Sequence, residues 1–275
     1  MVAGYLLGLR EGLEAALILG VTFGVLQRMR RSELAPSAWL GVAVAVLVSI
    51  AAAVILFSVG ARLEGRAEQL FEGVTMLLAA GILTWMILWM GVQGRQVQIG
   101  LEREVAEAAS RRQASAIFIV AFLAVMREGI ETALFLSAAA FQDEQTAVVL
   151  GGLAGIASAC ALGWGLYRAT IRLNVRRFFQ VTGLLLILFA AGLFSHAVHE
   201  FVEAGLLPGL LDPVWDIGAV LSETSFVGTL LRTLFGYNAD PNLLEVLAYL
   251  GYLAGVWTAL RFLRDRKPTP ALAPG

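Results

Sequence analysis

The sequence predicts an all-α integral membrane protein with seven transmembrane helices. Its 275 residues are 59% hydrophobic and 15% charged, whereas a soluble domain is about 25% charged. Apolar stretches of the length that crosses a bilayer, about 20 residues, recur along the chain. Two of these stretches also contain the charged pattern Arg-Glu-Gly-x-Glu, at 10–14 and 127–131. Charge kept inside a membrane span is expected to serve a function.

The order of the spans and the charge of their connections predict the topology. The connections after spans one, three, five and seven contain fifteen Arg and Lys residues, and the other connections contain three. Because basic residues gather in cytoplasmic connections, this bias places the N-terminus outside the cell and the C-terminus in the cytoplasm. The expected spans are 4–26, 38–60, 70–93, 116–141, 147–167, 178–204 and 243–263.

The two charged patterns also indicate an internal repeat. They lie 117 residues apart, and seven of the ten positions from each Arg onward are identical. Three is an odd number of spans, so two three-span halves would insert in opposite senses, as in the inverted repeats of many secondary transporters. The predicted parts are a first three-helix repeat with a cytoplasmic connector (1–113), a second repeat (114–204), an extracytoplasmic loop with an interfacial helix at 222–235 (205–242), and a seventh span with a disordered cytoplasmic tail (243–275).

The carboxylates of the two patterns form the first candidate metal site. Residues three and four apart share one helix face, so each pattern presents its charged groups together. One charge at the centre of a span costs about 2.5–3.5 kcal/mol, so six such groups cannot face lipid. Four carboxylates against two guanidiniums leave a negative surplus that favours a hard cation such as Fe(III), Mn(II), Mg(II) or Ca(II). The expected roles are metal ligation by Glu11, Glu14, Glu128 and Glu131, charge balance by Arg10 and Arg127, and close approach of the two helices at Gly12 and Gly129.

The only two histidines of the chain belong to a second cluster. His196, His199 and Glu200 share a face at the outer end of the sixth span, and imidazole with carboxylate suits iron or another transition metal. Glu72, at the outer end of the third span, is expected beside the same approach. These residues predict a first metal-binding site on the outer side, with a polar cap in the lipid headgroup layer as the alternative interpretation. Glu245 is expected only to interact favourably with the helix dipole in the first turn of the seventh span.

Composition argues against several other functions. A net charge of −1 gives no case for nucleic acid, and the single Cys160 can form no intrachain disulfide. The only lysine, Lys267, leaves no Gly-Lys-Ser/Thr phosphate loop. A membrane-embedded carboxylate metalloenzyme and a structural subunit held by Arg–Glu clasps are the alternatives from other classes. Di-iron bundle enzymes use Glu-x-x-His pairs, and spans one and four contain no histidine, so the enzyme is disfavoured.

The doubled pattern resembles the oxidase-dependent iron transporter family, which includes the high-affinity iron permeases of fungi and the bacterial EfeU-like iron permeases. The resemblance extends to Phe71-Glu72-Gly73, to His196-x-x-His199-Glu200 and to 236–238 and 244–249. It implies a seven-span permease that imports iron, with the four pattern glutamates as translocation ligands. It also implies a multi-pass protein of the bacterial inner (plasma) membrane.

The same resemblance suggests which molecules the chain meets. Iron would be the transported substrate, and no cofactor would be permanently bound. Family members work with a ferroxidase or, in bacteria, with an extracytoplasmic iron-binding protein and a haem peroxidase, so such partners are expected here. A lead-uptake branch shares the doubled pattern, which makes a permease for lead or another divalent metal such as manganese the alternative.

Overall fold

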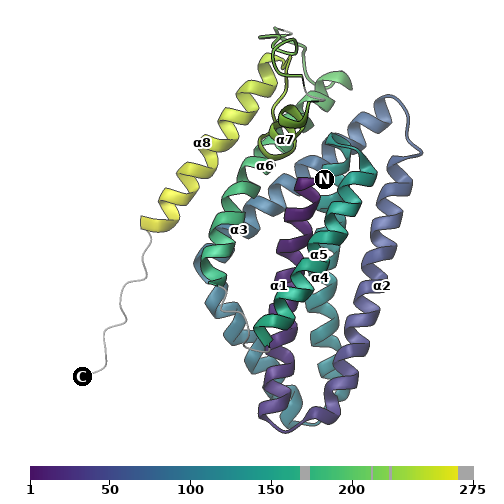
Figure 1. Cartoon of the computed structure of the whole chain (residues 1–275), viewed down its shortest axis with the longest axis vertical. Helices are drawn as coiled ribbons and strands as arrows, with labels where there is room; N and C mark the ends of the chain where they lie inside the picture. Colours follow the sequence, from purple (N-terminus) through teal and green to yellow (C-terminus); the bar gives the residue numbers. More distant parts are fainter. Residues whose placement is uncertain (168–173, 212, 223–224, 266–275) are drawn as a thin grey trace.

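The computed structural model describes residues 1–167, 174–211, 213–222 and 225–265, and these residues form helices without any strand (Figure 1). The elements are α1 (Val2–Arg28), the short 3₁₀ helix η1 (Ser32–Leu34), α2 (Ala35–Gly60), α3 (Arg66–Ser110), α4 (Ala114–Gln142), α5 (Gln145–Tyr167), α6 (Val175–Glu203), α7 (Phe226–Phe235) and α8 (Leu243–Asp265). Each expected span coincides with one long helix. Arg168, Arg172 and the tail from Arg266, with Lys267, lie outside the described residues.

The length and apolar character of the helices agree with an integral membrane protein. Five helical segments of the described residues are long and apolar enough to cross a membrane: Ser32–Gly60, Arg66–Trp89, Gln145–Gly165, Arg177–Glu203 and Leu243–Phe262. The helices α1 and α4 are also long, with 27 and 29 residues. They stand apart from the five because each has the three charged residues of its Arg-Glu-Gly-x-Glu pattern in the middle of its apolar stretch.

Helix α3 continues without a break to Ser110, whereas the sequence predicts that the third span ends near 93 and that a separate short surface helix, a solvated connector, follows at 96–113. Helix α3 has 45 residues, and its C-terminal part is held by tertiary packing. Val105 is fully buried there in an apolar cluster with Leu26 of α1 and Ile117 of α4. The charged residues around Val105 suggested a solvated connector, but one apolar face is enough to bind the helix to its neighbours.

The helices pair across the two halves of the chain. Helix α1 packs most extensively against α5, α2 against α4, and α3 against α6. The α1–α5 contact is a close backbone approach: a Cβ at Gly8 would collide with the backbone of Gly152, and one at Gly155 would collide with the backbone of Tyr5. Small residues at such positions are what allow membrane helices to approach closely.

This close approach gives a first testable prediction. Gly8→Leu is expected to separate α1 from α5 and to destabilise the protein by at least about 1–3 kcal/mol, the range for overpacking, because the obstructing atoms are backbone. Gly20→Leu on the same helix is the matched control, since a Cβ there meets nothing within 4 Å. Thermal unfolding of the purified variants in detergent measures the difference. Equal melting temperatures for the two variants would contradict the packing of α1 on α5.

The chain after α6 folds back over the end of that helix. The side chain of Ser225 accepts a hydrogen bond from the Gly228 N–H and caps α7, so the helix predicted at 222–235 begins four residues later, at Phe226. Gly236 ends α7 with φ +66° and lies against Gly192 of α6. Helix α8 then packs along α6 (Figure 1).

Candidate metal centre

Three glutamates of the doubled pattern meet inside the protein. Glu11 from α1 and Glu128 and Glu131 from α4 each offer a carboxylate oxygen, and these oxygens lie within 4.8 Å of one another. Among the described residues they are the one set of three His, Cys, Asp or Glu side chains that is close enough to share a metal ion. Glu14 lies one turn further along α1, with its residue 9% exposed. We call these four residues the glutamate cluster.

The two arginines of the pattern pair with the glutamates of their own helices. Arg10 Nε lies 3.3 Å from Glu14 Oε1, and Arg10 Nη1 lies 3.6 Å from Glu11 Oε1. Arg127 Nε donates a hydrogen bond of 2.9 Å to Glu131 Oε1. The two arginines differ in burial, because the side chain of Arg10 is 3% exposed and that of Arg127 is 43% exposed.

The glutamate cluster has more acceptor atoms than the protein satisfies. Both carboxylate oxygens of Glu11, and one each of Glu14, Glu128 and Glu131, are buried without a hydrogen-bond partner among the described residues. A buried acceptor without a partner is costly. When all four carboxylates are ionised, the two guanidiniums leave two negative charges uncompensated. A hard cation would satisfy both the acceptor atoms and the charge.

The glycines of the pattern have different partners from those expected. A Cβ at Gly12 would lie 2.8 Å from the Ala159 Cβ of α5, and one at Gly129 would collide with Ser49 of α2. Neither glycine therefore lies at a contact between α1 and α4. The expectation was wrong about the partner because a glycine two residues from an inward-facing carboxylate lies on another face of its helix.

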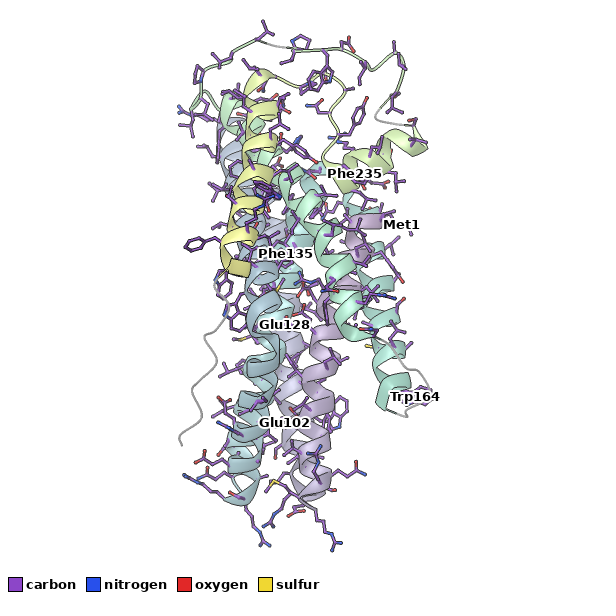
Figure 2. All side chains as sticks on the ribbon, turned by 90° about the vertical axis from the view of Figure 1, so that its left-hand side faces the viewer. Met1, Glu102, Glu128, Phe135, Trp164 and Phe235 are labelled. Carbon is purple, nitrogen blue, oxygen red and sulfur yellow. The ribbon has the colours of Figure 1, made fainter. Side chains whose placement is uncertain are left out.

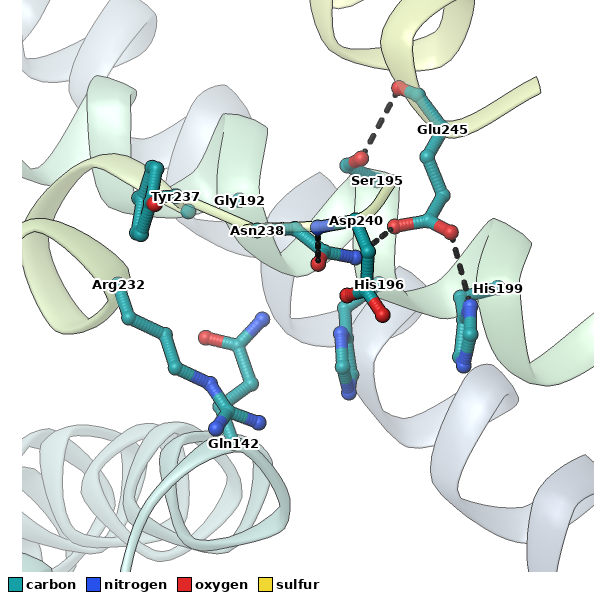
Figure 3. Close-up of a pocket in the computed structure, with 11 residues that line it drawn as sticks. Gln142, Gly192, Ser195, His196, His199, Arg232, Tyr237, Asn238, Asp240 and Glu245 are labelled. Atoms are coloured by element: carbon teal, nitrogen blue, oxygen red, sulfur yellow. Dashed lines mark hydrogen bonds and ion pairs between the residues drawn. The ribbon is translucent and has the colours of Figure 1, made fainter. Parts of the chain in front are cut away.

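A polar cavity of about 270 Å³ lies between α4, α6, α7 and the start of α8 (Figure 3). We call it the outer cavity. His196 and His199 line it from α6, as does Glu245 from α8. Gln142, the last residue of α4, and Arg232 of α7 lie together in the view of Figure 3, across the cavity from His196. The remaining lining residues are Gly192, Ser195, Gly236, Tyr237, Asn238 and Asp240.

Glu245 holds one wall of the outer cavity together, a role that exceeds the dipole interaction expected for it. His199 Nδ1 lies 2.8 Å from Glu245 Oε1, and Asn238 Nδ2 donates a hydrogen bond of 2.8 Å to Glu245 Oε2. The Ser195 hydroxyl donates to the backbone carbonyl of Glu245. Asn242 and Glu245 also form a reciprocal cap at the start of α8, in which the Asn242 side chain accepts from the Glu245 N–H.

The other two residues of the predicted outer cluster lie beside the cavity and do not line it. Glu200 is buried on α6, with its Oε1 3.8 Å from His196 Nε2. Glu72 is partly buried on α3, within electrostatic range of Glu200 and of Glu68. The structure therefore gathers the predicted residues at one end of α3 and α6 but divides them. The histidines face the cavity, and the two carboxylates form an acidic approach next to it.

A layer of buried apolar side chains separates the outer cavity from the glutamate cluster. Phe135 of α4 is 0% exposed, one turn from Glu131 and two turns from Gln142. Along the long axis of the molecule it lies between Glu128 and Phe235, which ends the helix α7 that borders the cavity (Figure 2). The layer also contains the fully buried Leu7 of α1, Leu83 of α3 and Leu193 of α6. A polar path between the two sites would have to pass this layer.

Sequence reasoning missed several polar residues of the cavity. Gln142 and Arg232 lie far apart in the chain and belong to no motif. Gln142 alone carried a signal, because Glu128, Phe135 and Gln142 recur every seven residues and so share one face of α4. The fold brings this face to the cavity at one end and to the glutamate cluster in the middle.

Comparison with known proteins places these features in a family context. The chain matches the model of the family described as "Iron permease FTR1 family" over residues 1–263. It is 38% identical over 255 residues to the ferrous iron permease EfeU of Escherichia coli O157:H7 and to that of Shigella sonnei, with 92% of both chains covered in each case. It is 35% identical to EfeU of Yersinia pestis, over 92% of this chain and 90% of the relative. No solved structure matches.

Proposed function

Because the chain belongs to the iron permease FTR1 family, we propose that it imports iron across the plasma membrane through the glutamate cluster. Membership makes the chain a permease rather than an enzyme, and iron is its transported substrate rather than a cofactor. The similar EfeU proteins are named as ferrous iron permeases, which favours Fe(II) as the transported form. The bacterial relatives favour the inner membrane as the location.

One observation carries the proposal. Carboxylates from two helices, far apart in the chain, converge within 4.8 Å and keep buried oxygens without hydrogen-bond partners among the described residues. A purely structural clasp would match each carboxylate with a donor, since breaking or omitting a buried partner is costly. Oxygen ligands with a net negative charge suit a small divalent cation such as Fe(II) or Mn(II).

The pairing of the helices supports two inverted repeats. In such an arrangement α1, α2 and α3 correspond to α4, α5 and α6, and a pseudo-two-fold axis exchanges the halves. The exchange turns the α1–α5 contact into an α4–α2 contact and maps α3–α6 onto itself, which agrees with the observed pairs. The glutamate cluster, built from the first helix of each half, would then lie near the axis, where transporters of this kind bind substrate.

The charge bias of the connections orients this arrangement in the membrane. With α1 and α4 as spans, the chain crosses the membrane seven times, with its N-terminus outside. The outer cavity then opens to the outside and the α1–α2 and α3–α4 connections lie in the cytoplasm. Iron passes the acidic approach at Glu72 and Glu200, enters the outer cavity beside His196 and His199, and reaches the glutamate cluster when the Phe135 layer opens. A second opening on the cytoplasmic side completes alternating access.

The membrane potential is sufficient to drive import. Each elementary charge gains about 2.3 kcal/mol per 100 mV, so a divalent ion gains about 4.6 kcal/mol. Because about 1.4 kcal/mol corresponds to a tenfold ratio, this energy supports an accumulation of more than about a thousandfold without ATP.

Uptake of radioactive iron into proteoliposomes tests the proposal. The purified protein is expected to take up iron with ascorbate present, when the ion is Fe(II), and to do so faster as an inside-negative potential is applied. The double variant Glu128→Gln/Glu131→Gln, with an unchanged melting temperature, is expected to abolish uptake. Passage of lead or manganese with exclusion of iron would assign the chain to another metal. Equal uptake by the double variant would reject the glutamate cluster as the path.

A further inference from the structure

The outer cavity has two histidines, but only one of them is available to a metal. Both ring nitrogens of His199 already face carboxylates: Nδ1 lies 2.8 Å from Glu245, and Nε2 lies 3.3 Å from Glu203. Glu245 is occupied in turn by hydrogen bonds from Asn238 and Asn242. This network builds the wall of the cavity and leaves no free donor atom on His199.

Three other lining residues have side-chain atoms that can bind a metal and that make no hydrogen bond or close ion pair among the described residues. The side-chain oxygen of Gln142 is buried without a hydrogen-bond partner among the described residues, and the residue is only 7% exposed. The carboxylate of Asp240 makes no ion pair within the described part of the chain, although its backbone N–H is bound by Asn238. Asp240, His196 and Gln142 all line this cavity, and Figure 3 shows the Gln142 amide beside Arg232, across the cavity from His196 and Asp240.

His196 has the surroundings of a metal-ligating histidine. Its Nε2 faces Glu200 at 3.8 Å, and its ring stacks on that of His199 with centroids 5.5 Å apart. Metal-bound histidines almost always direct the second ring nitrogen to a carboxylate or another acceptor, which fixes the ring. Glu200 would therefore orient His196, whose Nδ1 has no partner among the described residues.

Charge and size of the outer cavity fit a hydrated divalent cation. Glu245 and Asp240 line the cavity beside Arg232, and Glu200 and Glu203 lie against the two histidines, so the carboxylates in and around the cavity outnumber its cationic groups even when His199 is charged. A water molecule takes about 30 Å³ of liquid volume, so the cavity of about 270 Å³ holds a cation together with most of its first hydration shell. Carboxylate and amide oxygens with one imidazole nitrogen suit Fe(II) or Mn(II).

We propose that His196, Asp240 and Gln142 form a second cation site in the outer cavity, which binds a partly hydrated divalent metal before it reaches the glutamate cluster. The inference deepens the proposed function, because it names the ligands of the outer site and removes His199 from them. Glu200 and His199 are positioning residues here. The nitrogen ligand distinguishes this site from the glutamate cluster, whose ligands are all oxygen.

Mn(II) binding followed by electron paramagnetic resonance tests the site. The protein is expected to bind two Mn(II) ions per chain. The variant Glu128→Gln/Glu131→Gln is expected to keep one ion, whose echo modulation shows coupling to ¹⁴N. In that background, Asp240→Asn, Gln142→Leu and His196→Leu should each weaken the binding of the remaining ion by at least about tenfold. His196→Leu should also remove the nitrogen coupling. Glu144→Gln, which changes an exposed carboxylate two residues beyond Gln142 that does not line the cavity, is the matched control.

The outcomes separate this inference from the proposed function. No Mn(II) bound in the Glu128→Gln/Glu131→Gln background, or a remaining ion without nitrogen coupling, would overturn the outer site and leave the glutamate cluster standing. A remaining ion that Asp240→Asn and Gln142→Leu do not affect would also overturn it. Two ions retained in the same background would reject the glutamate cluster. Melting temperatures close to that of the background confirm that each variant is folded.

Discussion

Glu11→Gln is expected to reduce iron uptake by about 100-fold or more at an unchanged level of folded protein. Glu11 belongs to the three carboxylates that converge within 4.8 Å, and both its oxygens are free of hydrogen bonds among the described residues. Loss of groups that merely orient metal ligands already costs about 10–100-fold, so loss of a ligand is expected at or above the upper end. Gln keeps the size of the side chain and removes only the charge.

Glu14→Gln is the matched comparison within the same helix. Glu14 carries the same side chain, one turn away, but its carboxylate lies outside the set of three and faces Arg10 at 3.3 Å. We therefore expect it to act by placing Arg10, with a loss of uptake nearer to about tenfold. The measurement is the initial rate of radioactive Fe(II) uptake per folded protein. A larger loss in Glu14→Gln than in Glu11→Gln would show that the metal binds at another point of the cluster.

The sequence was sufficient to predict that the two charged patterns meet. Six charged groups in two apolar stretches cannot face lipid. The lowest-energy arrangement therefore brings the two patterns together in the protein interior. The helical character of the spans follows from length and apolar composition, and the helices of the structure begin and end close to the expected bounds, except that α3 continues to Ser110. Which three of the four glutamates converge depends on the rotation of α1 relative to α4, and no local pattern specifies it.

The parts that sequence could not predict depend on contacts between distant segments. From the sequence, Glu245 could be assigned only to the first turn of a helix. Its pairing with His199 requires the loop before α8 to fold back on α6, which no local pattern indicates. The same folding brings Asp240 and Gln142 to one cavity. Helix α3 was expected to end near 93 because polar residues follow, but Val105 shows that one buried face is enough to continue it. Periodicity gives the face of a helix and not the neighbour that covers it.

Arg10→Gln is expected to destabilise the protein by about 3–5 kcal/mol, the range for removing one partner of a buried ion pair. The Arg10 side chain is 3% exposed and faces both Glu11 and Glu14, so its loss leaves two buried carboxylates without their cation. Arg127→Gln, in the second copy of the pattern on α4, is the matched control. An intramembrane arginine faces the protein interior or water, so we expect the 43% exposed Arg127 to be partly hydrated. Its loss should cost about 1 kcal/mol or less.

Divalent metal should restore more stability to Arg10→Gln than it adds to the wild-type protein. A cation in the glutamate cluster would replace the missing guanidinium charge, and a ligand stabilises the folded state more strongly as its affinity rises. Melting temperatures with and without Mn(II) measure this difference, with Arg10→Gln/Glu11→Gln/Glu14→Gln as the control that removes the carboxylates as well. A clasp without a metal function predicts the same loss for Arg10→Gln but no rescue. The absence of rescue would therefore contradict a cation site, even if Arg10 proves essential for folding.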